Sequence, residues 1–316
     1  MSSMVEITGV PDGWKSHGDD RQERVGFFTD TSICIGCKAC EVACKEWNLV
    51  PEDGLLWTGE SYDNTSELGA NSWRHVAFIE QQKPARLAPD EEAPISLDGD
   101  RAELGGGGGD SMRWLMSSDV CKHCTHAACL DVCPTGALFR TEYGTVVVQQ
   151  DVCNGCGYCV PACPFGVLDK RHLPAKPGDA PLALPLLGKK EDGRVWKCTL
   201  CYDRLKGGHE PACAKACPTD SIQFGPLDEL RERADARLAK LQAENWNGAQ
   251  LYGRDPDDGV GGFGAFFLLL DEPEVYGLPP DPVVVTKQLP ELWRTTALAA
   301  AGVAVGILAG FLGGSR

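Results

Sequence analysis

The chain has 316 residues, enough for one large or two small domains with a buried core, and 43% of them are hydrophobic. A formal net charge of −15 argues against nucleic acid or an anionic lipid surface as a ligand and favours other proteins. Residues 1–24 are polar and contain neither the apolar core of a cleavable export signal nor a twin-arginine pair, so we expect any export to depend on a partner's signal.

The sixteen cysteines fall into four groups of four. The first and third groups have the spacing C-x2-C-x2-C-x3-C, while the second and fourth lengthen the middle gap. Such gaps let one short loop present three thiolates to a cube of iron and sulfide, and the fourth cysteine reaches a different cluster. The groups are Cys34, Cys37, Cys40 and Cys44; Cys121, Cys124, Cys129 and Cys133; Cys153, Cys156, Cys159 and Cys163; and Cys198, Cys201, Cys213 and Cys217.

Prolines 134, 164 and 218 directly follow the last cysteine of three groups, where a fixed φ turns the chain away from the cluster. The first group lacks this proline, and Lys45 continues a predicted short helix through Trp47. Disulfides are typical of secreted chains, which usually carry a signal peptide, and zinc ribbons do not use repeated triplets spaced by two residues. The pattern therefore predicts [4Fe–4S] clusters, with no cysteine left for catalysis.

The segments between the groups predict few elements. In chain order, the residues 73–79 (WRHVAFI) predict a strand, Gly105–Gly109 a loop tip, and Thr145–Val148 a strand after a turn at Gly144. The stretch Leu173–Leu187 is rich in proline and alanine and predicts an extended loop. Pro226–Trp246 predicts an amphipathic helix with a solvated charged face, because apolar residues recur at helical spacing: Leu227, Leu230, Ala234, Leu238 and Leu241.

His123 and His126 lie inside the second group, but four cysteines already complete the ligand set, so we do not expect either histidine to bind iron. At most they tune a cluster's potential through hydrogen bonds to sulfur, and Lys122 and Lys197 beside ligand cysteines could do so by charge. There is no glycine-rich fingerprint followed by an acidic residue, hence no predicted nicotinamide site.

The pairing of the groups follows from their spacing. Two neighbouring ferredoxin motifs exchange their fourth cysteines, and only residues 135–152 lie between groups two and three, which we therefore pair as an inner unit. Groups one and four then form an outer unit. The predicted ligand sets are Cys34, Cys37, Cys40 and Cys217; Cys44, Cys198, Cys201 and Cys213; Cys121, Cys124, Cys129 and Cys163; and Cys133, Cys153, Cys156 and Cys159.

The last segment, Thr295–Leu312, contains no charge and approaches the length of about 20 residues that a membrane span needs. Trp293 and Arg294 stand before it as an interfacial anchor would. Gly302, Gly306 and Gly310 form a stripe that would let another transmembrane helix approach closely. The alternative is a buried Ala/Gly-rich helix at a soluble subunit interface.

The predicted fold class is thus α+β, with two nested ferredoxin-like units, long insertions and one C-terminal transmembrane helix. We expect a polar extension (1–24), a double ferredoxin-like domain with four clusters (25–225), an amphipathic helix with an extended docking segment (226–292) and a membrane anchor (293–316).

From about Gly26 to the C-terminus, the protein resembles the iron–sulfur (beta) subunit of respiratory formate dehydrogenase. The resemblance rests on three segments, CIGCKACEVACKEWN, KCTLCYDRLKGGHEPACAKACP and LLLDEPEVYGLPPDP. It implies a non-catalytic electron-transfer subunit with four [4Fe–4S] clusters on all sixteen cysteines, in the crossed arrangement given above. Related nitrate reductase subunits replace one cysteine by tryptophan, and this protein does not.

The resemblance also implies partners: a molybdopterin alpha subunit, holding molybdenum or tungsten, that oxidises formate, and a membrane cytochrome b (gamma) subunit that reduces quinone. It implies that the outer unit faces the catalytic subunit and the inner unit the quinone side. The protein would then lie on the cytoplasmic membrane, single-pass through residues 295–312, with its globular part on the periplasmic face; some relatives stay inside, so the cytoplasmic face is the alternative. The glycine loop, the proline-rich insertion and the short tail depart from the family.

Two other functions stay open. One is the equivalent subunit of another membrane oxidoreductase, such as a hydrogenase, polysulfide reductase or dimethyl sulfoxide reductase, which the identity of the neighbouring subunit would distinguish. The other is a free polyferredoxin, against which the terminal apolar helix argues.

Overall fold

A four-stranded sheet lies at the centre of the body, in the order β8–β1–β10–β9. Its strands are β1 (Val25–Asp30), β8 (Ile222–Pro226), β9 (Gln250–Tyr252) and β10 (Ala265–Leu269). β1 pairs antiparallel with β8 and parallel with β10. Every residue of β10 is buried, as expected for a parallel strand covered on both faces. Residues 225 and 226 both belong to β8, so the predicted domain boundary between them lies within a strand that is hydrogen-bonded to β1.

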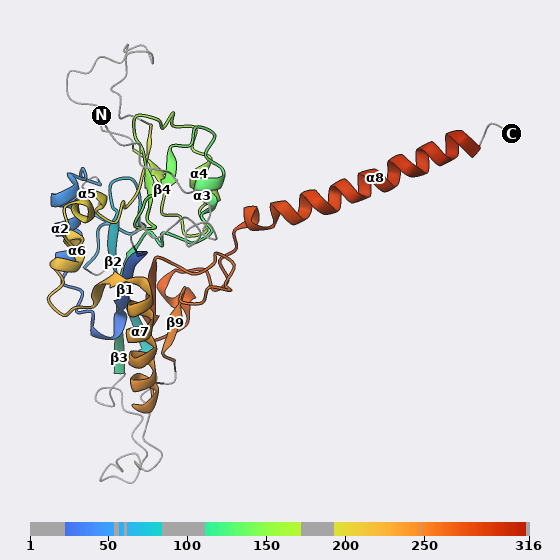
Figure 1. Cartoon of the computed structure of the whole chain (residues 1–316). Coiled ribbons are helices and arrows are strands. Elements are labelled where there is room, and N and C mark those ends of the chain that lie inside the picture. The colour runs from blue at the N-terminus through green and yellow to red at the C-terminus, as the bar shows by residue number, and fades with distance from the viewer. Residues whose placement is uncertain are drawn as a thin grey trace, which may run out of the picture.

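The computed structural model describes residues 23–53, 57–59, 62–83, 111–171, 193–246 and 248–313. The predicted loops at Gly105–Gly109 and Leu173–Leu187 lie outside these ranges, as do residues 1–22. The body is mixed α and β, and a long helix leaves it at the C-terminal end (Figure 1).

Helix α7 (Leu227–Ala243) confirms the predicted amphipathic helix and ends three residues earlier than expected. It lies against β1, and four apolar side chains at helical spacing are buried there: Leu227, Leu230, Ala234 and Leu241. Fully burying such side chains stabilises a fold by about 1.5–3 kcal/mol each for leucine. The acidic and basic side chains of the helix are mostly exposed, as predicted.

Three two-stranded hairpins surround the central sheet. The long one pairs β2 (Arg74–Lys83) with β3 (Ser111–Val120), so the strand predicted at residues 73–79 is real but continues four residues further. A short one pairs β4 (Leu138–Arg140) with β5 (Val146–Val148), which confirms the predicted valine strand. The third pairs β6 (Asp169–Lys170) with β7 (Val195–Trp196).

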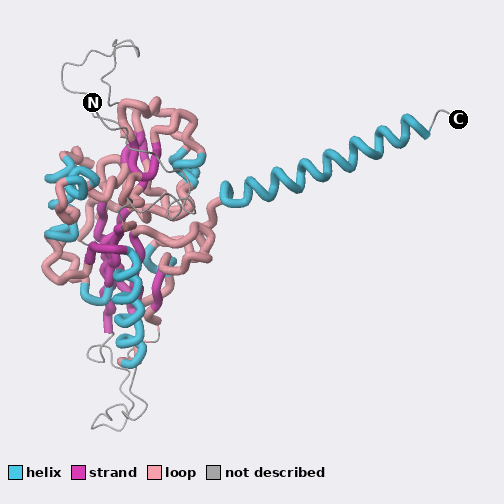
Figure 2. Tube along the Cα trace, viewed as in Figure 1, coloured by secondary structure: helices cyan, strands magenta, loops and turns pink. Residues whose placement is uncertain are grey.

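The helices of the cysteine groups are short, as the tube view shows (Figure 2). In groups two to four, one-turn helices carry the third cysteine and end just before the last cysteine and its proline: α3 (Ala128–Asp131), α4 (Cys159–Ala162) and α6 (Ala212–Lys215). Proline cannot continue a helix, because it lacks the N–H and clashes with the preceding turn. Without that proline, α2 (Ala39–Asn48) continues past the last cysteine of its group, as predicted, and ends one residue beyond Trp47. Helix α5 (Tyr202–Lys206) lies inside the fourth group.

The C-terminal region contains two 3-10 turns, η3 (Pro273–Tyr276) and η4 (Val285–Gln288), and then helix α8 (Leu289–Gly313). A further 3-10 turn, η1 (Thr31–Ile33), joins β1 to the first cysteine group. Helix α8 extends away from the body (Figure 1), and its segment Glu291–Phe311 is long and apolar enough to cross a membrane. None of that segment is buried against the body.

The close approach of β1 and the segment before β10 yields a testable prediction. A Cβ atom added to Gly26 would lie 2.0 Å from the carbonyl oxygen of Gly264, so Gly26→Ala must push these segments apart. We expect a loss of about 1–3 kcal/mol in stability, measured as a lower apparent Tm of the anaerobically purified protein. Gly225, the pairing partner of Gly26 on β8, is the matched control, because its added Cβ would lie 4.0 Å from Leu230. Equal Tm values for the two variants would contradict this packing.

Candidate iron–sulfur centres

The first set of cysteines lines one pocket. Cys34, Cys37 and Cys40 come from the loop before α2 and its first turn, and Cys217 comes from the turn after α6. The pocket encloses about 290 Å³, part of it open to solvent, and contains no carboxylate or histidine among the described residues that line it. Gly36 has a φ of +65°, and a Cβ there would lie 2.6 Å from the ring of Phe78, so the tight loop depends on glycine.

The pairing of β1 with β8 explains how Cys217 reaches this loop. Cys34 follows the end of β1 by four residues, and Cys217 precedes the start of β8 by five. Thr29 and Ile222 are register partners, so the antiparallel pairing returns the end of group four to the start of group one. Hairpin β4–β5 returns the end of group two to the start of group three in the same way, because Cys133 precedes β4 by five residues and Cys153 follows β5 by five.

A second pocket, of about 370 Å³, belongs to the third predicted set. Cys121, Cys124 and Cys129 line it together with Cys163 from the turn after α4. Its other lining residues are apolar, apart from Lys122 and the histidines His123 and His126.

In the remaining two sets, the thiols lie close enough for the charge of one to raise the pKa of another. Burial raises the pKa of Cys44 well above its ordinary value, and the charges of Cys198 and Cys213 raise it further. Burial is the main reason that the pKa of Cys159 rises to about 11. The charge of Cys133 raises it further, and Cys153 and Cys156 make smaller contributions.

Each of the four predicted sets contains thiols from two different groups. The thiols surround a space rather than a point: in the described part of the protein, no three Cys, His, Asp or Glu side chains are grouped so as to hold a single metal ion. Buried thiolates repel one another, and a group that brings positive charge relieves that repulsion. The donor type, the enclosed space and this repulsion all fit a [4Fe–4S] cube. The ligand sets themselves stay a prediction.

The four sets form a series. The charge of Cys213 in the second set acts on Cys40 in the first, and Cys121 in the third is the strongest charged neighbour of Cys198 in the second. Cys159 in the fourth set acts on Cys129 in the third. Of the sixteen cysteines only Cys37 and Cys156 are exposed, one in the first set and one in the last.

Comparisons with known proteins agree with this geometry. Three family models described as a 4Fe-4S dicluster domain match residues 33–137, 112–176 and 152–222. The nitrate-inducible formate dehydrogenase iron–sulfur subunit of Escherichia coli is 38% identical over 289 residues, which cover 90% of this protein and 82% of the relative. The protein belongs to the formate dehydrogenase iron–sulfur subunit family.

Other relatives extend the comparison. The formate dehydrogenase iron–sulfur subunit of Haemophilus influenzae is 37% identical over 92% of this protein and 79% of its own length. A subunit of the anaerobic dimethyl sulfoxide reductase of Escherichia coli is 34% identical over 66% of this protein and 76% of its own length. This member of the formate dehydrogenase iron–sulfur subunit family is thus an electron-transfer subunit with [4Fe–4S] clusters, and not a catalytic subunit.

In this iron–sulfur subunit, His123 is held as a neutral ring. The backbone N–H of Val146 donates to its Nδ1 at 3.0 Å, so the ring proton must lie on Nε2. Burial, and after it the charge of Lys197, keeps the pKa of His123 well below its usual value. Nε2 is buried and has no hydrogen-bond partner among the described residues, which leaves an N–H donor in the wall of the third set's pocket.

Two lysines beside ligand cysteines are buried, each 1% exposed. Lys122 pairs with Asp119 and also donates to the carbonyl oxygen of Val120 at 3.1 Å. Lys197 donates to the carbonyl oxygens of Val146 and Cys198, the latter at 2.9 Å. Both charges act on thiols, Lys122 on Cys124 and Lys197 on Cys129, and both ammonium groups have protein partners.

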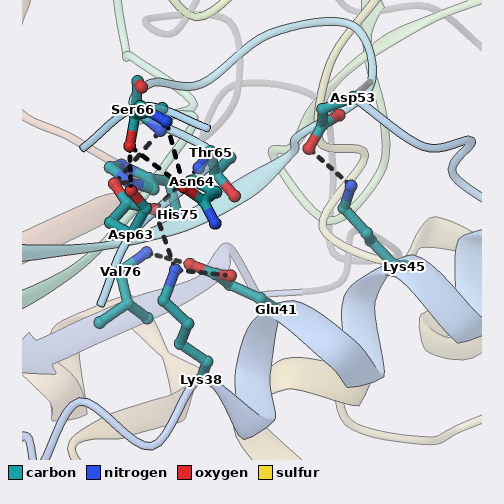
Figure 3. Close-up of polar contacts among 11 residues, drawn as sticks. Lys38, Glu41, Lys45, Asp53, Asp63, Asn64, Thr65, Ser66, His75 and Val76 are labelled. Carbon is teal, nitrogen blue, oxygen red and sulfur yellow. Dashed lines mark hydrogen bonds and ion pairs between the residues drawn. The ribbon is translucent and has the colours of Figure 1, made fainter. Parts of the chain in front are cut away.

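A network of charged side chains fixes the first cysteine loop to β2 (Figure 3). Lys38, at the αL residue before α2, donates to Glu41 at 3.4 Å and to Asp63 at 3.0 Å. Asp63 also bonds His75 at 2.6 Å, and Glu41 accepts the backbone N–H of Val76. Sequence reasoning missed this network, because its members are spread over residues 38–76 and no motif joins them.

The network predicts how stability depends on Asp63. Burial alone would raise the pKa of Asp63, but hydrogen bonds from the Thr65 N–H, His75 and Lys38 outweigh it and lower the pKa to about 2. Because this lies below the unfolded value of about 3.9, the stabilisation is present above about pH 4 and is lost as pH falls toward 2. Asp63→Asn should cost about 1–2 kcal/mol near neutral pH, measured as a lower apparent Tm than wild type.

The control for Asp63→Asn is Asp53→Asn. Asp53 pairs with Lys45 and is more exposed than Asp63 (Figure 3). Pairs of that kind contribute about 0–1 kcal/mol, so its Tm should stay close to wild type. Equal apparent Tm values for Asp63→Asn and Asp53→Asn would contradict a stabilising role for the Asp63 network.

Proposed function

We propose that this subunit carries electrons between a molybdopterin (molybdenum or tungsten) subunit that oxidises formate and a membrane cytochrome b that reduces quinone. The observation that carries the proposal is the continuous series of four cysteine sets with one exposed thiol at each end, Cys37 and Cys156. A [4Fe–4S] cluster, when bound, takes up or releases one electron at a potential set by its surroundings. The cysteines hold the clusters, and the buried body around them limits solvent access.

The proposed ligand sets are the crossed ones: Cys34, Cys37, Cys40 and Cys217; Cys44, Cys198, Cys201 and Cys213; Cys121, Cys124, Cys129 and Cys163; and Cys133, Cys153, Cys156 and Cys159. Two pockets support the first and third sets directly, and the mutual thiol charges support the second and fourth. The two antiparallel pairings that return a fourth cysteine to another group support two nested ferredoxin-like units.

The position of the C-terminal helix supports the orientation of the series. Thr286 in η4 donates to Asp131 in α3 at 2.6 Å, and Val284 lines the pocket of the third set. The residues just before α8 are therefore attached to the inner unit, and Figure 1 shows α8 leaving the body on that side. We propose that the inner unit faces the membrane and that the first set faces the catalytic subunit.

Helix α8 supports a membrane anchor, and by family resemblance the globular body lies on the periplasmic face of the cytoplasmic membrane. A Cβ added at Gly302, Gly306 or Gly310 would meet nothing within 4 Å, so the stripe is open to a partner's helix. The dimethyl sulfoxide reductase alternative is the second candidate, but that relative matches a smaller share of the protein. Formate-dependent quinone reduction by the purified complex distinguishes the two.

The crossed ligation predicts which signals a cysteine substitution disturbs. Cys217→Ser should alter the EPR signal of the cluster held by Cys34, Cys37 and Cys40, because one of its four ligands is changed. The matched variant Cys133→Ser, at the same position of group two, should instead alter the fourth cluster and leave the outer pair intact. An effect of Cys217→Ser confined to the cluster of Cys198, Cys201 and Cys213 would show that the pairing is wrong.

Deleting Thr295–Arg316 should release the subunit, with its catalytic partner, from the membrane fraction. All sixteen cysteines and α7 lie upstream, so iron content should be unchanged. Dye-linked formate oxidation should survive while formate-to-quinone transfer is lost, since the anchor holds the inner unit to the membrane partner. Gly306→Leu is the milder variant: it fills the stripe without lowering hydrophobicity and should weaken partner attachment only. Quinone reduction at the normal rate by the truncated complex would rule out an anchor.

A further inference from the structure

Arg74, the first residue of β2, is one of the most deeply buried charged side chains in the described part of the protein, at 2% exposure. Its guanidinium lies over the ring of Phe27 on β1, with Cζ 4.9 Å from the ring centroid. Nη1 donates to the hydroxyl of Ser118 at 2.9 Å and to its carbonyl oxygen at 3.3 Å. Nε and Nη2 are buried and have no hydrogen-bond partner among the described residues.

This arginine lies between the first and second cysteine sets. The four thiols whose charges act most strongly on it are Cys213, Cys40, Cys198 and Cys44, one from the first set and three from the second. Their charges raise the pKa of Arg74 above its usual value, although burial alone would lower it. Ser118, which binds Arg74, has its hydroxyl oxygen 3.2 Å from the sulfur of Cys40.

Arg74 differs from the other buried cations near the cysteines. Lys122 has a carboxylate partner, and Lys197 has two carbonyl partners. Arg140 donates to the carbonyl oxygens of Gly144, Cys124 and Thr125 through both of its terminal nitrogens, whereas Arg74 donates through Nη1 alone to the described residues. No carboxylate within ion-pairing distance of Arg74 exists among the described residues. A buried charge without a counter-ion is strongly unfavourable, and a guanidinium cannot shed its proton to escape that cost. The negative charge available to Arg74 is that of the two cysteine sets.

We propose that Arg74 is a positioning residue shared by the first two clusters: its permanent charge and unpaired N–H donors raise the reduction potentials of both. This inference rests on the proposed ligand sets. A reduced cluster carries one more negative charge than an oxidised one, so a nearby fixed cation favours the reduced form. One residue would then act on both clusters in the same direction, so its removal should lower both potentials together.

The test is an EPR-monitored redox titration of the full-length protein, purified anaerobically, with iron content measured for each variant. Arg74→Gln removes the charge and should lower the potentials of the first two clusters, with a tenfold or larger loss in the equilibrium constant for reduction, about 59 mV per tenfold for one electron. The fourth cluster should stay unchanged. Arg74→Lys keeps the charge and should shift the first two clusters less than Arg74→Gln does.

Two further variants complete the design. Arg113→Gln removes a cation at the opposite end of the same hairpin, where it pairs with Asp271, and should shift no potential. Ser118→Ala removes the hydroxyl between Arg74 and Cys40 and should lower the reduction potential of the first cluster alone. If Arg74→Gln fails to hold its clusters, Arg74→Lys and Ser118→Ala provide the test. The proposal is overturned if Arg74→Lys, which keeps the charge, shifts the reduction potentials of all four clusters. It is also overturned if Ser118→Ala leaves the reduction potential of the first cluster unchanged.

Unshifted first and second clusters in an iron-replete Arg74→Gln protein would also overturn it. The readout needs neither formate nor quinone, so it is independent of the proposed partners. If Cys217→Ser and Cys133→Ser disturb the expected signals while Arg74→Gln shifts none, this inference fails and the proposed function stands. If those two variants disturb the wrong signals, the ligand sets fail first.

Discussion

The rest of the structure depends on how the body tolerates sixteen thiols in four close sets, all but two of them buried or half-buried. Burial raises the pKa of most of these thiols, and neighbouring thiols within a set raise it further. As thiolates they would repel strongly, so each set is stable only around a core that brings positive charge. Arginine and lysine side chains enclosed between the sets supply more of that charge, in a protein whose net charge is −15. Folding and cluster binding are therefore expected to be coupled.

This constraint explains why strand pairing matters to the sites. In the proposed ligand sets each set takes thiols from two groups, so no set would be complete until distant segments have paired. β1 and β8 bring together the first and last groups of the sequence, and β4 with β5 does the same for the middle two over a short hairpin. β10 then pairs with β1 as a fully buried strand, so residues well beyond the last cysteine complete the sheet that supports the outer pair.

The series of sets also has an orientation relative to the C-terminal helix. The exposed thiol of the first set, Cys37, lies in the loop that the network of Lys38, Glu41 and Asp63 holds to β2. At the other end, η4 contacts α3 and the pocket of the third set, just before α8 begins. An outer loop held to β2 and a C-terminal segment held to α3 fit the proposed place of the subunit between two partners, because both ends would have to keep a constant distance to their redox partners.

The sequence by itself determined what depends on local spacing: the cysteine groups, the helix that continues in group one where proline is absent, the face of α7, the strand at Val146–Val148 and the apolar terminal helix. Proline, hydrophobic period and ligand spacing act within a few residues, so they can be read along the sequence. Only the tertiary structure decided the order of the sets, the pairing of β1 with β10, the Asp63 network and the place of Arg74. Each of these brings together residues far apart in sequence. An arginine in an ordinary strand pattern carries no local mark that it will lie, buried, between two sets of thiols.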